Sequence, residues 1–115
     1  MGLSRSNRLT KVDNFAEIKK SEGCRKILSN GFVFYICPNK KNVSRIAVVC
    51  FSKLGDACVR NKLKRRVHEI FRLNNVRFKY YADIIVIPQK DVMPLANYLY
   101  IEKHFLNTLK QIRII

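Results

Sequence analysis

The sequence predicts a single α+β domain spanning residues 1–115, in which helices pack on one mixed sheet of three to four strands. Three patterns predict this class. A long basic segment in the middle of the chain has apolar residues at helical spacing, β-branched and aromatic runs lie on both sides of it, and a second helical stripe follows. The expected order of elements is αββ(β)αβα, and no repeat or linker divides the chain.

The chain is expected to begin with a basic arm and a short helix. Residues 1–11 are polar and basic without periodicity, so they form an arm that is either disordered or docked. Asp13 has a side chain suited to capping a helix that runs through Lys20. Gly23 then breaks this helix.

Three stretches before the basic segment are predicted to be strands. Residues 24–28 form the first, and residues 32–37, which are rich in aromatic and β-branched side chains, form the second and end at Pro38. Residues 45–51 are another β-branched run. The polar turn at residues 39–42 predicts that the second and third strands pair as a hairpin.

The basic segment is predicted to form a helix that begins after a cap at Asp56 and ends near Asn74 or Asn75. Its apolar side chains occupy about a third of the helix circumference, a width suited to packing on a core. These are Val59, Leu63, Val67, Ile70 and Phe71. Next to this stripe lie Lys64, His68, Asn61, Arg72 and Arg65, with Glu69, Lys62 and Arg66 further round. One flank of the helix is therefore a cationic surface rich in hydrogen-bond donors.

A strand and a helix are expected to close the chain. Residues 83–87 predict a buried strand that ends at Pro88, and Pro94 suits the first turn of the last helix. The apolar stripe of that helix is Leu95, Tyr98, Leu99, Phe105, Leu106, Leu109 and Ile112. Glu102 falls inside the stripe, so either the helix begins later or this carboxylate has a cationic partner.

The charge of the chain favours a polyanionic partner. Lysine and arginine outnumber acidic residues 23 to 8, which gives a formal net charge of +15 spread along the sequence. Basic helices also bind membrane surfaces or calmodulin-type partners, but those ligands need the apolar side of the helix, which is expected to be core here. No signal peptide or membrane-spanning run is present, so we expect a soluble protein with no membrane partner.

The four cysteines, at positions 24, 37, 50 and 58, have no metal-binding spacing. Cys37 and Cys50 fall in apolar strand-like runs, where a reduced cysteine behaves as a small hydrophobe. This usage predicts a reducing, cytoplasmic location. No metal site is expected.

Aromatic residues near the first helix are candidates for stacking on unpaired bases. Strand neighbours point to opposite faces of a sheet, so Phe32 and Phe34 share one face and Tyr35 lies on the other. We expect the two phenylalanines in the core. Tyr35 and Phe15 are then the candidates for contact with a ligand.

Residues 52–65, which read Ser-Lys-Leu-Gly-Asp-Ala-Cys-Val-Arg-Asn-Lys-Leu-Lys-Arg, resemble the protein subunit of bacterial ribonuclease P. In that family a turn with a hydrophobic residue and glycine precedes Arg-Asn-Arg-x-Lys-Arg at the start of a helix. Asn7-Arg8-Leu9 with Phe15 resembles the family's opening, and residues 82–87 resemble its last strand. The resemblance covers nearly the whole chain and implies a fold like that of domain 2 of ribosomal protein S5.

The resemblance also implies a function. In that family the protein binds a large catalytic RNA, and the RNA with its Mg²⁺ ions removes the 5′ leader of precursor tRNA. The residues that would contact RNA are Arg8, Lys53, Arg60, Asn61, Lys62, Lys64, Arg65, His68 and Arg72. Phe15 and Tyr35 would line a cleft for the single-stranded leader. The protein itself would bind no cofactor, and its oligomeric state and the class of its partner RNA stay open.

Three positions depart from the family's usual residues. Lys62 and His68 stand where arginine is usual, so a bidentate phosphate contact becomes a point charge at one position and a titratable ring at the other. Lys19 stands near the leader cleft, where some relatives have an aromatic ring.

The chain is not expected to be a nuclease by itself. Its eight acidic residues are scattered and do not suggest a two-metal site, and no nucleophile motif is present. The alternative to a ribonuclease P subunit is a general RNA-binding or ribosome-associated protein of similar fold that takes no part in cleavage.

Overall fold

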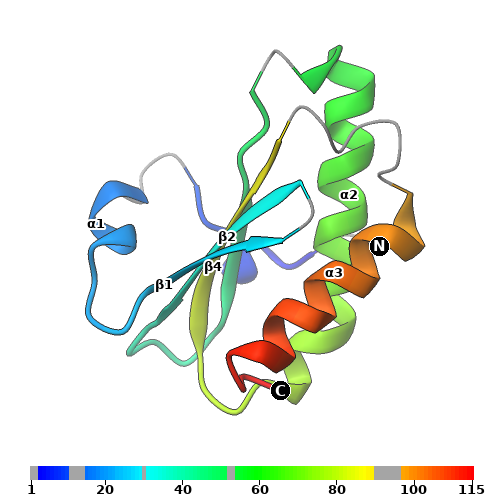
Figure 1. Cartoon of the computed structure of the whole chain (residues 1–115). Coiled ribbons are helices and arrows are strands. Elements are labelled where there is room, and N and C mark those ends of the chain that lie inside the picture. Colours follow the sequence, from blue (N-terminus) through cyan, green and yellow to red (C-terminus); the bar gives the residue numbers. More distant parts are fainter. Residues whose placement is uncertain (1–2, 11–14, 30, 52–53, 90–96) are drawn as a thin grey trace.

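A four-stranded mixed sheet organises the computed structural model, which describes residues 3–10, 15–29, 31–51, 54–89 and 97–115 (Figure 1). In chain order the elements are α1 (Phe15–Lys19), β1 (Arg25–Ser29), β2 (Phe32–Pro38), β3 (Arg45–Val48), α2 (Ala57–Asn74), β4 (Ala82–Pro88) and α3 (Tyr98–Gln111). The predicted class, an α+β domain with one mixed sheet, is confirmed.

The strand order is β1-β2-β4-β3, so the predicted hairpin between β2 and β3 is wrong. β4 lies between them, antiparallel to β2 and parallel to β3. The physical reason is the composition of β4, whose residues Ile84 and Ile85 are both fully buried although they point to opposite faces. A strand that is apolar on both faces belongs in the centre of a sheet. The antiparallel hairpin is formed by β1 and β2 instead.

The two faces of the sheet are covered differently. Helices α2 and α3 pack on one face, and α1 lies on the other (Figure 1). Phe32 and Phe34 are both 1% exposed on the α2 and α3 side, as predicted. Tyr35 is half-buried on the α1 side, where Phe15 and Ile18 also pack. Among the described elements, α1 is the only helix on this second face, where Leu28 of β1 is 72% exposed.

The basic helix has the predicted limits. The Asp56 side chain accepts a hydrogen bond of 3.0 Å from the Val59 backbone, which caps α2 at its N-terminus.

The backbone turns from α1 to β1 through Gly23, which has a φ of 80°. The predicted cap at Asp13 and the predicted first-turn residue Pro94 lie outside the described residues.

Helix α3 differs from its prediction in where it begins and which side chains it buries. Asn97 caps it, so the described helix starts at Tyr98. Its buried residues are Ile101, Phe105, Thr108 and Leu109, so Glu102 lies beside the buried stripe and not inside it. Leu99, which was predicted to lie in the stripe, is 73% exposed.

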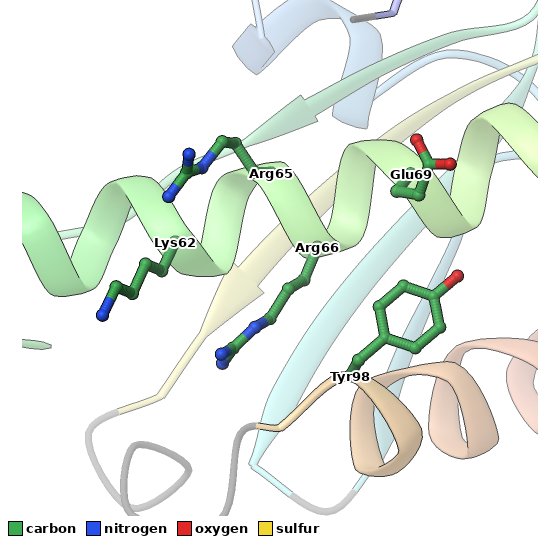
Figure 2. A pocket seen from close by; sticks show the side chains of 5 residues that line it. All are labelled: Lys62, Arg65, Arg66, Glu69 and Tyr98. Atoms are coloured by element: carbon green, nitrogen blue, oxygen red, sulfur yellow. The ribbon is translucent and has the colours of Figure 1, made fainter. Parts of the chain in front are cut away.

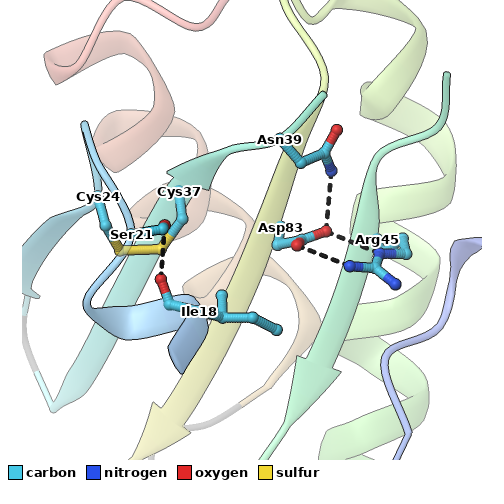
Figure 3. Close-up of a disulfide and its surroundings, with 7 residues drawn as sticks. All are labelled: Ile18, Ser21, Cys24, Cys37, Asn39, Arg45 and Asp83. Atoms are coloured by element: carbon cyan, nitrogen blue, oxygen red, sulfur yellow. Dashed lines mark hydrogen bonds and ion pairs between the residues drawn. A yellow bond between two sulfur atoms is a disulfide. The ribbon is translucent and has the colours of Figure 1, made fainter. Parts of the chain in front are cut away.

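A buried ion pair fixes the start of β3 against the start of β4. Two nitrogens of Arg45 each donate to an oxygen of Asp83 over 2.8 Å, and the Asn39 side chain donates to Asp83 over 2.9 Å (Figure 3). Asp83 is 5% exposed, so these bonds compensate a carboxylate that burial would otherwise penalise.

The structure joins Cys24 and Cys37 in a disulfide, so the prediction that Cys37 is a reduced thiol is wrong (Figure 3). The bond links the segment before β1 to the end of β2. The two cysteines are close because β1 and β2 pair antiparallel with Arg25 opposite Ile36, which places residue 24 beside residue 37. The sequence alone does not reveal this register. Cysteine usage therefore no longer supports the predicted cytoplasmic location. Cys50 and Cys58 are free.

Reduction of this disulfide should lower the free energy of unfolding. The two cysteines are 13 residues apart, and closing a loop of about 15 residues stabilises a protein by roughly 3 kcal/mol in the chain-entropy model. Urea denaturation with and without reductant measures the difference. A Cys50→Ser/Cys58→Ser variant should respond to reductant as the parent does, and Cys37→Ser should not respond. Equal stability of the parent in both conditions would contradict the disulfide.

Of the described helices, none combines the length and the apolar character needed to cross a lipid bilayer.

Candidate RNA-binding site

A groove of about 480 Å³ lies where α1, the N-terminal segment, β3 and α2 meet. We call it the α1 groove. Its basic and aromatic lining residues are Arg8, Phe15, Lys64 and His68. Leu9, Ala47, Val49 and Cys50 form much of its apolar surface. Residues predicted from three separate parts of the sequence therefore come together in one cavity.

Arg8 is held at this groove by backbone pairing. The Leu9 backbone N–H donates to the Ile46 carbonyl over 2.9 Å, and Arg8 forms a parallel bridge with Ile46. The Asn7 side chain donates to the Ser44 carbonyl over 2.8 Å. Since Leu9 is also buried, residues 7–9 are docked along the outer edge of β3, and Arg8 lies beside α2.

Burial and two cations keep His68 neutral. Its pKa is lowered below its ordinary value, first by burial and then by the charges of Arg8 and Lys64. The imidazole can therefore accept a proton from solution when a phosphate approaches, because the added negative charge favours the protonated form. Burial also raises the pKa of the neighbouring Cys50 thiol, so this thiol stays protonated.

RNA binding should become tighter as the pH falls from about 8 to 6, if a phosphate contacts His68. The pKa of His68 is low in the free protein and rises in the complex, so binding takes up a proton, and one coupled proton changes the binding constant by at most about tenfold per pH unit. His68→Gln should remove this dependence. His104→Gln is the matched control, and it should keep the dependence. The same pH profile in all three proteins would place His68 outside the interface.

The other flank of α2 faces the start of α3. A cavity of about 380 Å³ there is lined by Lys62, Arg65, Arg66 and Glu69 of α2 and by Tyr98 of α3. Figure 2 shows Arg66 extending from α2 toward the start of α3, whereas Arg65 points away from α3. The predicted single cationic flank is therefore divided in the structure. Lys64 and His68 line the α1 groove, and Lys62 and Arg65 line this second cavity.

The other predicted contacts on α2 differ in how available their side chains are. Asn61 is exposed near the start of the helix. Arg60 is half-buried, and its Nε donates weakly to the Asp56 carbonyl over 3.4 Å. Arg72 forms a two-pronged ion pair with Glu69, with one nitrogen–oxygen distance of 3.0 Å. An RNA phosphate at Arg72 must therefore compete with Glu69. Lys53 lies outside the described residues.

Tyr35 lies outside the α1 groove but on the same face of the sheet. The register places Lys26, Tyr35, Ile85 and Ala47 side by side across the four strands, so Tyr35 is two strands away from the groove wall at Ala47. The amine of Lys19 is 4.7 Å from the centre of the Tyr35 ring, and that of Lys26 is 5.9 Å away. The ring is thus flanked by cations from α1 and β1.

Several residues of this site escaped the sequence analysis. Leu28 is 72% exposed and pairs with the half-buried Val33, which extends the apolar surface beside Tyr35. Strict alternation along β1 could have placed Leu28 and Lys26 on this face once Ile27 was assigned to the core. Nothing in the sequence places Tyr98 beside Arg66, because that contact depends on how α2 and α3 cross.

No cluster of three or more side chains that could hold a metal ion occurs among the residues that the structure describes. The described acidic residues include Asp83, which is bonded to Arg45, and Glu69, which is bonded to Arg72.

Comparison with known proteins places the chain in a family. The family model described as Ribonuclease P matches residues 3–113. The ribonuclease P protein component of Alkaliphilus oremlandii is 33% identical over 110 residues, which are 95% of this chain and 93% of the relative. That of Petrotoga mobilis is 35% identical over 90 residues, which are 78% of this chain and 75% of the relative.

Solved structures agree with these sequence relatives. The ribonuclease P protein from Thermotoga maritima superimposes with a TM-score of 0.78 at 34% identity, covering 90% of this chain and 96% of that one. The protein from Staphylococcus aureus gives a TM-score of 0.81 at 29% identity, covering 94% of this chain and 96% of that one.

A small, strongly basic α+β domain with a cationic helix beside an aromatic-lined groove belongs to the class of RNA-binding proteins. The chain belongs to the ribonuclease P protein family. It is therefore a protein component of a ribonuclease that processes tRNA.

Proposed function

We propose that this chain is the noncatalytic subunit of a ribonuclease P whose RNA, with its Mg²⁺ ions, cleaves the 5′ leader from precursor tRNA. In this proposal α2 binds the catalytic RNA through Arg60, Asn61, Lys62, Lys64, Arg65 and His68. Arg8 and Lys53 extend that interface, and Arg72 joins it once it leaves Glu69. The single-stranded leader lies on the α1 face of the sheet, where it contacts Phe15 and Tyr35.

The lining of the α1 groove is the main support for this proposal. Its wall on one side is the cationic helix, through Lys64 and His68, and on the other side it is α1, through Phe15. A leader lying in this groove is therefore next to an RNA bound on α2. Tyr35 lies on the same face of the sheet, two strands from the groove wall at Ala47, and the Lys19 and Lys26 amines can neutralise phosphates beside a base stacked on its ring.

The chain's charge suits a positional and electrostatic role. The formal charge of +15 offsets repulsion between two RNAs that must approach closely, namely the catalytic RNA and the substrate. Protein cations at that interface replace part of the counterion atmosphere, so the complex should need less Mg²⁺ than the RNA alone. No step of bond breaking is assigned to a protein side chain.

Reconstitution at low Mg²⁺ tests this function. The chain is combined with a bacterial ribonuclease P RNA and precursor tRNA, and cleavage is compared with that by the RNA alone. We expect the protein to accelerate cleavage at low Mg²⁺ and to have a smaller effect at high Mg²⁺. A general RNA-binding protein would bind this RNA and an unrelated RNA of equal length alike without changing the cleavage rate, and that outcome would favour the alternative function.

A further inference from the structure

A second surface with aromatic and cationic residues lies at the end of the sheet where β3 and β4 begin. A cavity of about 440 Å³ is formed there by the segment that follows α2 and by the turn before β3. Its main lining residues are Val76, Phe78, Lys79, Tyr80, Tyr81 and Ser44. We call this surface the Tyr80–Tyr81 cavity. The function proposed above does not use it.

The aromatic side chains of this cavity are unusually accessible. Tyr81 is 51% exposed, Tyr80 is 37% exposed and Val76 is 83% exposed. Exposed apolar surface gathered in one place commonly marks an interaction site. The Tyr80 and Tyr81 rings are not needed to fill the core, because Phe78 anchors this segment there by packing edge-on against Phe71.

The backbone that carries the two tyrosines is held firmly. The Lys79 N–H donates to the Ile114 carbonyl over 2.7 Å, and the Asn39 N–H donates to the Tyr81 carbonyl over 3.0 Å. The Asn39 side chain in turn bonds to Asp83. The surface is therefore preformed, and a ligand does not have to order this segment when it binds.

The charge around the cavity is positive. Lys79 lines it, and the Asn39–Tyr81 hydrogen bond brings the turn with Lys40 and Lys41 beside it. No ion pair joins these three lysines to a carboxylate within the described part of the chain. Asp83, at the start of β4, is already committed to Arg45 and Asn39. The complementary ligand is therefore anionic.

We propose that the Tyr80–Tyr81 cavity is a second RNA-binding site, which takes unpaired nucleotides. Bases stack on Tyr80 or Tyr81, and the phosphates lie near Lys40, Lys41 and Lys79. Stacking platforms combined with cations are the usual means of holding single strands, since every base has a flat face. At 1.5 Å per residue, Arg60 and Asn75 are roughly 22 Å apart along α2. The site therefore binds a different RNA segment from the one at the start of the helix.

The test compares two polyanions, one with bases and one without. The probes are a short oligouridylate that carries one 2-aminopurine, whose fluorescence is quenched by stacking, and an inorganic polyphosphate chain. Both are titrated into the full chain carrying Tyr35→Ala, which removes the proposed leader contact at Tyr35. Adding Tyr80→Ala and Tyr81→Ala should weaken oligouridylate binding at least about fivefold, by the loss of one stacked base. Polyphosphate binding should not change.

Two further variants make the result decisive. The Tyr80→Phe/Tyr81→Phe pair keeps the rings and should retain oligouridylate binding, and Lys40→Gln/Lys41→Gln should weaken binding of both probes. The proposal is overturned if the alanine pair binds oligouridylate as its parent does, or if it loses both probes equally. It is also overturned if the alanine pair changes only the sedimentation of the free protein, which would make the surface a contact between copies of the chain. Because each variant is compared with a parent that has the same α1 face, these outcomes do not depend on whether the leader site exists.

Discussion

Replacing Lys64 and Arg65 together by glutamine should weaken binding to a bacterial ribonuclease P RNA by about 25- to 60-fold at 0.1 M salt. Lys64 lines the α1 groove and Arg65 lines the cavity beside α3. Both belong to the interface proposed for α2. Each phosphate contact contributes about 0.7 to 0.9 to the slope of log affinity against log salt. The slope should therefore become shallower by about 1.4 to 1.8, which filter binding across a salt series measures.

The control for this prediction removes two charges elsewhere. Lys103 and Lys110 are exposed on α3, and Lys103→Gln/Lys110→Gln lowers the net charge equally. This variant should keep the slope of the parent. If both pairs flatten the slope by the same amount, binding depends only on net charge, and α2 is not the specific interface.

Tyr35→Ala should weaken binding of leader-bearing precursor tRNA by the assembled enzyme about 5- to 150-fold. This range corresponds to the loss of one base stacked on an aromatic ring, at roughly 1 to 3 kcal/mol. Binding of mature tRNA should change by less than about twofold, because that molecule has no leader. The dissociation constants of the two substrates, measured with the same holoenzyme, provide the comparison.

A conservative variant separates stacking from structure at this position. Tyr35→Phe keeps the ring between Lys19 and Lys26 and should bind both substrates as the parent does. Equal losses for precursor and mature tRNA in Tyr35→Ala would mean that Tyr35 only supports the fold.

Features set by neighbouring residues, such as helix caps and the buried side of a helix, were predicted correctly from the sequence. Asp56 caps α2 as its side chain predicts, and the burial of Leu63, Val67, Ile70 and Phe71 follows from helical spacing. Strand pairing was less predictable. Residues 45–48 and 82–88 are far apart in the chain, and their parallel pairing depends on the crossover through α2.

The site was predictable as a set of residue types but not as an arrangement. Charge and spacing selected Lys64, Arg65 and His68 as candidates, and the alternation of strand residues separated Tyr35 from the core residue Phe34. The position of Arg8 beside His68 could not be predicted, because it results from a backbone bridge between residue 8 and Ile46. The cation neighbours of Tyr35 likewise depend on how α1 lies across the sheet.

The path of the leader on the protein can be measured by photo-crosslinking. Precursor tRNA with 4-thiouridine at single leader positions is bound to the reconstituted enzyme, irradiated, and the linked peptides are identified by mass spectrometry. We expect links on the α1 face, to Phe15, Tyr35 or neighbours in the α1 groove such as Cys50. Links confined to the outer surface of α3, on the opposite face of the sheet, would contradict it.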